Sequence, residues 1–111
     1  MPEVEIRADV RTILAELRRG LEAIYGDRLV RLVLFGSHAR REAREDSDID
    51  VMVVLQGPVD SGAEIARCSE YKSALCLKHD AWITSVYVSE DRFQTGQSPL
   101  LLNVRREGLA L

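Results

Sequence analysis

The apolar residues near the start of the chain recur every three or four positions, which is the spacing of one face of an α-helix. They predict an amphipathic helix over roughly residues 5–25, which Gly26-Asp27 would end. Further along, three short apolar runs are rich in β-branched residues and predict strands. We expect these strands at residues 29–35, 48–55 and 82–88.

Helical signals lie between the second and third strands and near the end of the chain. Ser61 and Glu64 form a capping-box pattern, so a helix is expected from Ser61 to about Lys78. Pro99 starts a last helix that runs through Arg106. The buried stripe of the longer helix is expected at Ile65, Cys68, Leu75 and Cys76. Short helical segments are also expected at residues 38–45 and 90–93.

The expected order of elements is α-β-α-β-α-β-α, which places the chain in the α/β class in its α+β variety. A small mixed sheet would be covered by helices. The 111 residues suffice for one hydrophobic core and are too few for two, so we expect residues 1–111 to form a single domain.

Composition excludes several classes of function. With 46% apolar and 30% charged residues the chain has the composition of a soluble globular protein. No apolar run approaches the roughly 20 residues of a membrane span, and the N-terminus is no signal peptide, so a cytoplasmic protein without membrane contact is expected. The net charge of −3 argues against direct binding of nucleic acid as the main function.

The two cysteines do not indicate a disulfide or a metal site. Cys68 and Cys76 lie eight positions apart in one expected helix, which corresponds to about 12 Å of axial rise and is too far for a disulfide. They also lack zinc-site spacing and paired histidines. We interpret them as small apolar residues of the core.

Asp48 and Asp50 are the most informative pair of residues. Side chains two positions apart on a strand point to the same face, so the two α-carbons would lie about 6.6 Å apart with both carboxylates together. Two negative charges this close are unfavourable unless a cation lies between them. Carboxylate oxygens suit a hard divalent ion, and Mg²⁺ commonly takes one or two carboxylates together with substrate phosphates.

Gly36-Ser37 follows the first strand and can bind an anion. A strand that ends in Gly-Ser can present backbone N–H groups and a hydroxyl to a phosphate, and glycine allows close approach. Other motifs fail on particular residues. Val51 stands where a calcium-binding EF-hand loop needs glycine, and no Gly-Lys-Ser/Thr follows Gly36 as in a Walker loop.

The spacing of these residues resembles a known signature. Gly36-Ser37, ten intervening residues and then Asp48-Ile49-Asp50 are similar to the motif of the polymerase-β-type nucleotidyltransferase superfamily. The longer strings Gly-Ser-His-Ala-Arg and Ser-Asp-Ile-Asp-Val resemble its small branch, the minimal nucleotidyltransferases. The resemblance extends over nearly the whole chain.

The resemblance implies roles for particular residues. Gly36 and Ser37 would contact the triphosphate, and Asp48 and Asp50 would be catalytic residues that bind the metal, Mg²⁺. Arg40 matches a family arginine that either contacts phosphate or forms a structural ion pair. Members of this branch often act with a protein that carries a HEPN domain, an RNase-like toxin. In some pairs they transfer AMP from ATP to a tyrosine of that toxin.

The third carboxylate of the family is less easily placed. Alignment by the end of the third strand puts Trp82 where that acid is expected. Asp80, two residues earlier, is our candidate for the third catalytic carboxylate, and the alternative is a turn residue between helix and strand. His38 and His79 are expected at the surface, and Trp82 in the core or in an interface with a partner.

Two functions therefore remain open. The first is a Mg²⁺-dependent nucleotidyltransferase that moves a nucleoside monophosphate, AMP from ATP, to a hydroxyl of a partner macromolecule, acting as antitoxin of a HEPN-type toxin. The second is a catalytically weak or inactive module of the same fold that neutralises its partner by binding. The sequence leaves the acceptor, the nucleotide preference and any homo-oligomer undetermined.

Overall fold

The computed structural model describes residues 8–40, 42–44 and 47–111. The helices are α1 (Ala8–Tyr25), the 3₁₀ turn η1 (Gly26–Arg28), α2 (Ser61–His79), α3 (Glu90–Thr95) and α4 (Pro99–Glu107). The strands are β1 (Leu29–Phe35), β2 (Ile49–Leu55), β3 (Ile83–Ser89) and the short β4 (Leu109–Ala110). No described helix combines the length and the apolar character that crossing a membrane requires.

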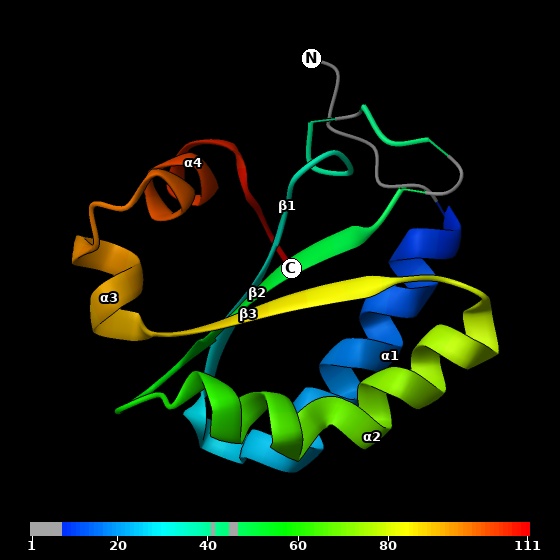
Figure 1. The fold of residues 1–111 in the computed structure, drawn as a ribbon, viewed down its shortest axis with the longest axis horizontal. Coiled ribbons are helices and arrows are strands. Elements are labelled where there is room, and N and C mark those ends of the chain that lie inside the picture. Colours follow the sequence, from blue (N-terminus) through cyan, green and yellow to red (C-terminus); the bar gives the residue numbers. More distant parts are fainter. Residues whose placement is uncertain (1–7, 41, 45–46) are drawn as a thin grey trace.

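The four strands form one mixed sheet in the order β3-β2-β1-β4, with β3 at one edge (Figure 1). β1 pairs antiparallel with β2 and with β4. β2 and β3 are parallel, and the chain returns between them through α2, the crossover that parallel strands need. The expected small mixed sheet is confirmed.

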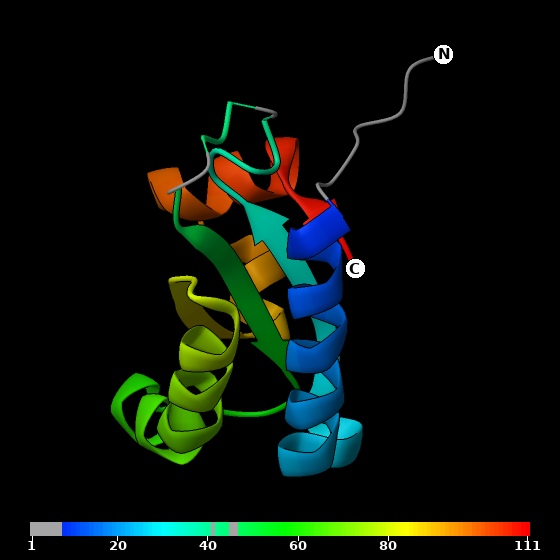
Figure 2. The same cartoon turned by 90° about the vertical axis from the view of Figure 1, so that its right-hand side faces the viewer.

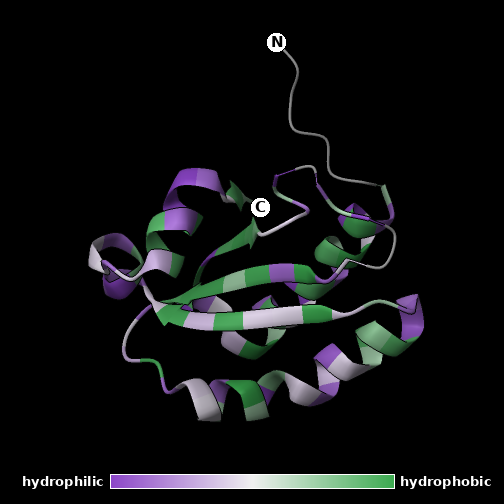
Figure 3. Cartoon of the chain, turned by 45° about the horizontal axis from the view of Figure 1, so that its top comes forward, coloured by the Kyte–Doolittle hydropathy of each residue, from purple (hydrophilic) through white to green (hydrophobic). Residues whose placement is uncertain are grey.

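Helices cover both faces of the sheet, α1 and α2 on one and α3 and α4 on the other (Figures 1 and 2). Alternate residues of β2 divide between the two cores: Ile49, Val51 and Val53 pack with α1 and α2, while Met52 packs with α3 and α4. Both faces of this central strand are therefore apolar along most of its length (Figure 3). Asp50 has the same parity as Met52 and lies at the end of the α3/α4 face.

The packing of α2 differs from the sequence expectation at its start. The residue that caps the helix is Asp60, whose carboxylate accepts a hydrogen bond from the backbone N–H of Ala63 at 3.2 Å. Glu64 is instead buried and accepts a 2.9 Å hydrogen bond from the Tyr25 hydroxyl of α1. Ile65, expected in the buried stripe, is 51% exposed, because Glu64 and Cys68 occupy the face that meets α1.

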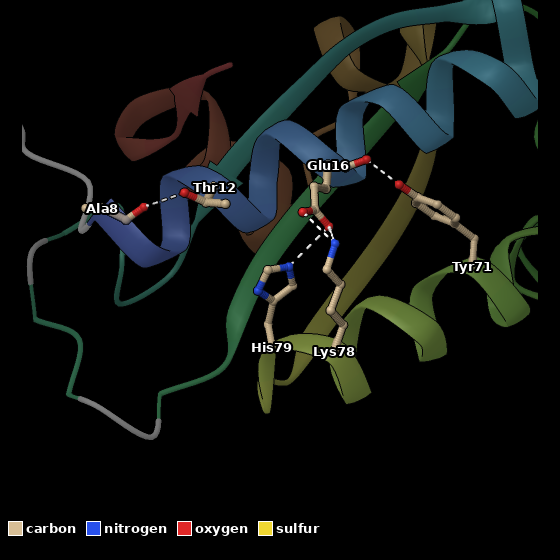
Figure 4. Close-up of polar contacts among 6 residues, drawn as sticks. All are labelled: Ala8, Thr12, Glu16, Tyr71, Lys78 and His79. Carbon is tan, nitrogen blue, oxygen red and sulfur yellow. Dashed lines mark hydrogen bonds and ion pairs between the residues drawn. The ribbon is translucent and has the colours of Figure 1, made fainter.

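The C-terminal end of α2 is held against α1 by polar contacts (Figure 4). The carboxylate of Glu16 accepts hydrogen bonds from Lys78 Nζ at 3.0 Å and contacts His79 Nε2 at 3.1 Å. The Tyr71 hydroxyl donates to the Glu16 backbone carbonyl, and its ring lies directly against Gly20 of α1. These contacts fix the point at which the chain leaves α2 for β3.

The segment between β1 and β2 is not the helix that its composition indicated. Residues 36–40 form turns and residues 42–44 have no regular structure, while residues 41, 45 and 46 lie outside the described part of the chain. Residues 5–7 of the expected first helix also lie outside it. Alanine, arginine and glutamate favour helices, but intrinsic preference decides little by itself, and the connection between two antiparallel strands overrides it here.

Candidate active site

The acidic pair lies where β2 begins. Asp48 is exposed and immediately precedes the strand, and Asp50 is half-buried within it. Asp50 lies opposite Phe35 of β1 and beside Thr84 of β3, so the carboxylate stands between two neighbouring strands. Burial, and secondarily the negative charge of Asp48, raise the pKa of Asp50. The two carboxylates are thus close enough to repel each other, as their spacing predicted.

Gly36 and Asp50 are in direct contact across the β1–β2 pair. Gly36 has a φ of +74°, and a β-carbon at this position would lie 2.2 Å from Asp50 Oδ2. A side chain is therefore excluded twice, by the left-handed backbone and by the carboxylate. The Gly-Ser turn and the acidic pair, ten residues apart in sequence, consequently form one site.

The turn after Gly36 is compact and places His38 and Arg40 near Asp50. The Arg40 N–H donates to the Gly36 carbonyl at 3.1 Å, and Ala39 is buried. His38 is only 5% exposed, with Nε2 3.4 Å from the Ser47 carbonyl, so the expectation of a surface histidine was wrong. His38 and then Arg40 act to lower the pKa of Asp50, against the larger effects of burial and Asp48.

Arg40 forms ion pairs in this structure. Its Nε lies 3.4 Å from Glu42 Oε2 and its Nη1 3.8 Å from Glu107 Oε2 of α4. Both contacts are partly exposed, so their contribution to stability is small. Arg40 therefore forms ion pairs here, and its contact with phosphate stays a prediction. A pocket of about 210 Å³ lies beside it, lined by Phe35, Gly36, Arg40, Leu100, Asn103, Val104 and Glu107.

The structure does not bring Asp80 to the acidic pair. Asp80 terminates α2 in the left-handed conformation, with a φ of 49°, and is exposed. It lines a pocket of about 120 Å³ on the α1 side of the sheet, together with His38, His79 and Trp82. Over residues 8–40, 42–44 and 47–111, no three His, Cys, Asp or Glu side chains are grouped so as to hold a metal ion. Asp80 therefore lies in the turn between α2 and β3, which was the alternative to a catalytic role.

The strand beside the acidic pair carries no acid in register with it. The Ile49 N–H donates to the Trp82 carbonyl at 2.8 Å, and Thr84 pairs with Asp50. Trp82 is 74% exposed, so it is not a core residue, and an interface with a partner remains a prediction. Nothing in the local pattern of β3 distinguishes Thr84, and only the parallel register shows that it adjoins Asp50.

Asp48 and Asp50 are suited to a divalent cation. Both offer hard oxygen ligands, and the raised pKa of Asp50 shows an electrostatic cost that a cation between the carboxylates would remove. Hydroxyl and backbone N–H groups of the adjoining Gly-Ser turn complement an anion. The arrangement therefore matches a metal-bound polyphosphate.

Comparison with known proteins agrees with this site. A family model described as a nucleotidyltransferase domain matches residues 14–93, which include both halves of the site. The chain belongs to the nucleotidyltransferase domain family. It is 35% identical over 80 residues to a candidate protein adenylyltransferase of Methanocaldococcus jannaschii, a match covering 72% of this chain and 74% of that protein.

Solved structures of nucleotidyltransferases share the fold. A candidate minimal nucleotidyltransferase is 30% identical, with 96% of this chain and 100% of that chain covered and a TM-score of 0.57. The complex of a tri-AMPylated HEPN toxin of Shewanella oneidensis with an MNT antitoxin matches at 20% identity, covering 92% of this chain and 67% of that chain, with a TM-score of 0.55. The resemblance to this second structure shows a common fold.

Proposed function

We propose that this nucleotidyltransferase transfers AMP from ATP to a hydroxyl group of a partner protein. The observation that carries the proposal is the contact between Gly36 and the Asp50 carboxylate, which unites a phosphate-binding turn with an acidic pair. Phosphoryl-type transfer needs little beyond such positioning and the neutralisation of phosphate charge.

Each residue of the site has a defined part in this reaction. Asp48 and Asp50 would hold Mg²⁺, which supplies positive charge to the phosphates when it is bound. Gly36, without a side chain, admits the triphosphate to the backbone, and Ser37 donates its hydroxyl to a phosphate oxygen. The acceptor oxygen bonds to the α-phosphorus, the bond to the β-phosphate oxygen breaks, pyrophosphate leaves and the hydroxyl proton is released.

The acceptor is proposed to be a HEPN-domain toxin, with this chain as its antitoxin. One observation supports a protein acceptor: a 35% identical relative is a candidate protein adenylyltransferase. The HEPN partner is proposed by analogy with the tri-AMPylated toxin of the Shewanella complex. Mg²⁺, ATP and this partner are parts of the proposal.

A second candidate function is a binding module of the same fold with little or no catalysis. The observation in its favour is the lack of an acid at Trp82 and Thr84, the two residues of the neighbouring strand that adjoin the acidic pair. Such a protein would neutralise its partner through contact alone.

One experiment separates these functions. The chain is incubated with α-labelled ATP, Mg²⁺ and the protein encoded by the neighbouring gene, as the proposed acceptor, and label on that protein is measured for wild type, Asp48→Asn and Asp80→Asn. If transfer occurs, wild type labels the acceptor, and Asp48→Asn lowers the rate of labelling by about 100-fold or more, since several kcal/mol of charge stabilisation are lost. Inhibition of the proposed acceptor without any label would refute transfer and establish the binding module.

A further inference from the structure

An apolar surface lies at the end of α2 and leads to the active site. Its residues are Cys76, Leu77, Ala81 and Trp82, which we call the Trp82 patch. Leu77 is 85% exposed and Trp82 is 74% exposed, the highest values among the large apolar side chains of the described chain. Together with Asp80 these residues line a depression of about 170 Å³. Contiguous exposed apolar groups of this kind mark interaction surfaces, and tryptophan is the residue most enriched at their centres.

The patch adjoins the active site through the backbone beside Asp48. Asp80, Ala81 and Trp82 also line the neighbouring pocket, whose wall includes Ser47, the residue directly before Asp48. The 2.8 Å hydrogen bond from Ile49 N–H to the Trp82 carbonyl holds the two backbones together at this point. Because Ile83 pairs with Ile49 in the parallel register, Trp82 lies beside Asp48, and a protein seated on Trp82 is next to the acidic pair. β3 is the edge strand, so no further strand of the described sheet lies on that side.

The backbone of the patch is held by hydrogen bonds within one turn. Asp80 holds the αL turn, with its N–H bonded to the Cys76 carbonyl, and the Ala81 N–H donates to the same carbonyl at 3.0 Å. One turn of backbone thus fixes Leu77 relative to Trp82, and the contacts of Glu16 attach this turn to α1 (Figure 4). A preformed surface loses little conformational entropy when it binds.

The charges around the patch define the surface that fits it. Lys78 and His79, the cationic residues next to Leu77 in sequence, contact the carboxylate of Glu16. Asp80 within the depression and Asp48 beyond it are exposed carboxylates. The complementary surface is therefore an apolar cleft bordered by lysine or arginine side chains.

We infer that the Trp82 patch is the docking surface for the acceptor protein and that it places the acceptor hydroxyl at the acidic pair. This inference rests on the proposed function for the identity of the partner. It assigns to Trp82, which stands near the expected position of a third carboxylate, a role in binding the acceptor protein.

The test uses the fact that Trp82 is the single tryptophan of the chain. Trp82 is replaced by 5-fluorotryptophan through biosynthetic labelling of the full chain, and its ¹⁹F resonance is followed while the unlabelled protein encoded by the neighbouring gene, the proposed acceptor, is added. Leu77→Lys places a charge in the patch. Ile65→Lys is the matched control, because Ile65 is also exposed on α2 but lies about 18 Å along the helix axis from Leu77.

The inference requires that the Trp82 resonance shifts on addition of the partner, and that Leu77→Lys weakens binding by about tenfold or more while Ile65→Lys matches wild type. Affinity for ATP, measured by calorimetry, should be equal in all three proteins. An unmoved resonance, equal binding by both variants, or a resonance that changes with the concentration of this chain alone would overturn it. A shift without label transfer from ATP would leave docking intact and refute the proposed reaction.

Discussion

Replacing Gly36 by alanine perturbs the active site at its most constrained point. The first consequence concerns the backbone. Gly36 has a φ of +74°, where a β-carbon costs about 1–2 kcal/mol. For a domain of this size a loss of 1 kcal/mol corresponds to roughly 4 °C in Tm. We therefore expect Gly36→Ala to lower Tm by several degrees while the chain remains folded.

The second consequence concerns Asp50. The new methyl group would lie 2.2 Å from Asp50 Oδ2, 3.1 Å from Cγ and 3.3 Å from Cβ, so the carboxylate must turn away from Gly36. Rotation of one short side chain costs little stability. A displacement of about 1 Å in a group that positions the reacting phosphate is sufficient for a 100-fold loss of rate. The loss of activity should therefore be much larger than the loss of stability.

Gly57→Ala is the matched control for this experiment. Gly57 has a φ of +85°, and a β-carbon there would meet no atom within 4 Å. The two variants share the cost of a left-handed alanine and differ in the contact with Asp50. Thermal melting should give similar decreases in Tm, whereas transfer of label from ATP should fall about 100-fold in Gly36→Ala and remain near wild type in Gly57→Ala.

Equal transfer rates in the two variants would refute this reasoning. Such a result would mean that the position of the Asp50 carboxylate against Gly36 has no part in the reaction. A loss of rate in Gly57→Ala as large as in Gly36→Ala would refute it as well, because the effect would then come from general destabilisation.

Four further substitutions test other parts of the structure. Burial and the charge of Asp48 raise the pKa of Asp50, so the folded protein loses stability as pH rises and Asp50 becomes charged. Without Mg²⁺, Asp50→Asn should therefore raise Tm at pH 7, and this gain should disappear toward pH 3. A lower Tm of Asp50→Asn at pH 7 would contradict this prediction. Hydrogen bonds from His79 and Lys78 lower the pKa of Glu16, so their stabilisation is present above the unfolded pKa of about 4.3 and is lost as pH falls. Glu16→Gln should accordingly melt below wild type at pH 7 and together with it near pH 3; a constant difference across this range would exclude the ion pairs as its cause. Gly20→Ala places a methyl group 2.0 Å from the Tyr71 ring and should lower the free energy of unfolding, measured in urea, by about 1–3 kcal/mol. An unchanged free energy of unfolding would contradict this contact. Asp80→Asn should keep the transfer rate of wild type, and a loss comparable to that of Asp48→Asn would restore Asp80 as a catalytic residue.

Expectations about the elements were most accurate where a long local pattern exists. The strands at residues 29–35 and 49–55 and the helix ending at Tyr25 agree with the expectations to within a residue or two, because their apolar periodicity spans the whole element. The segment after Gly36 has no such periodicity, and its helix-forming composition was misleading. β4 has only two residues, too few for any periodicity to show.

In the candidate site, too, only the features that depend on local sequence could be predicted. Gly36-Ser37 and Asp48/Asp50 were identifiable from residue types and spacing, because a strand of period two places both carboxylates on one face whatever surrounds it. Their meeting depended on the antiparallel register that sets Phe35 opposite Asp50. The burial of His38 and the place of Thr84 depend on contacts between distant segments, which no local pattern contains.

The sequence by itself determined the candidates for binding phosphate and metal, since that chemistry resides in glycine, serine and paired aspartates at a given spacing. Only the tertiary structure decided which of the remaining candidates join them. Asp80 forms the left-handed turn at the end of α2, and Trp82 is exposed beside the strand that carries the pair. The physical reason is that the parallel register of β2 and β3, set by packing on both faces of the sheet, determines which residues adjoin the carboxylates.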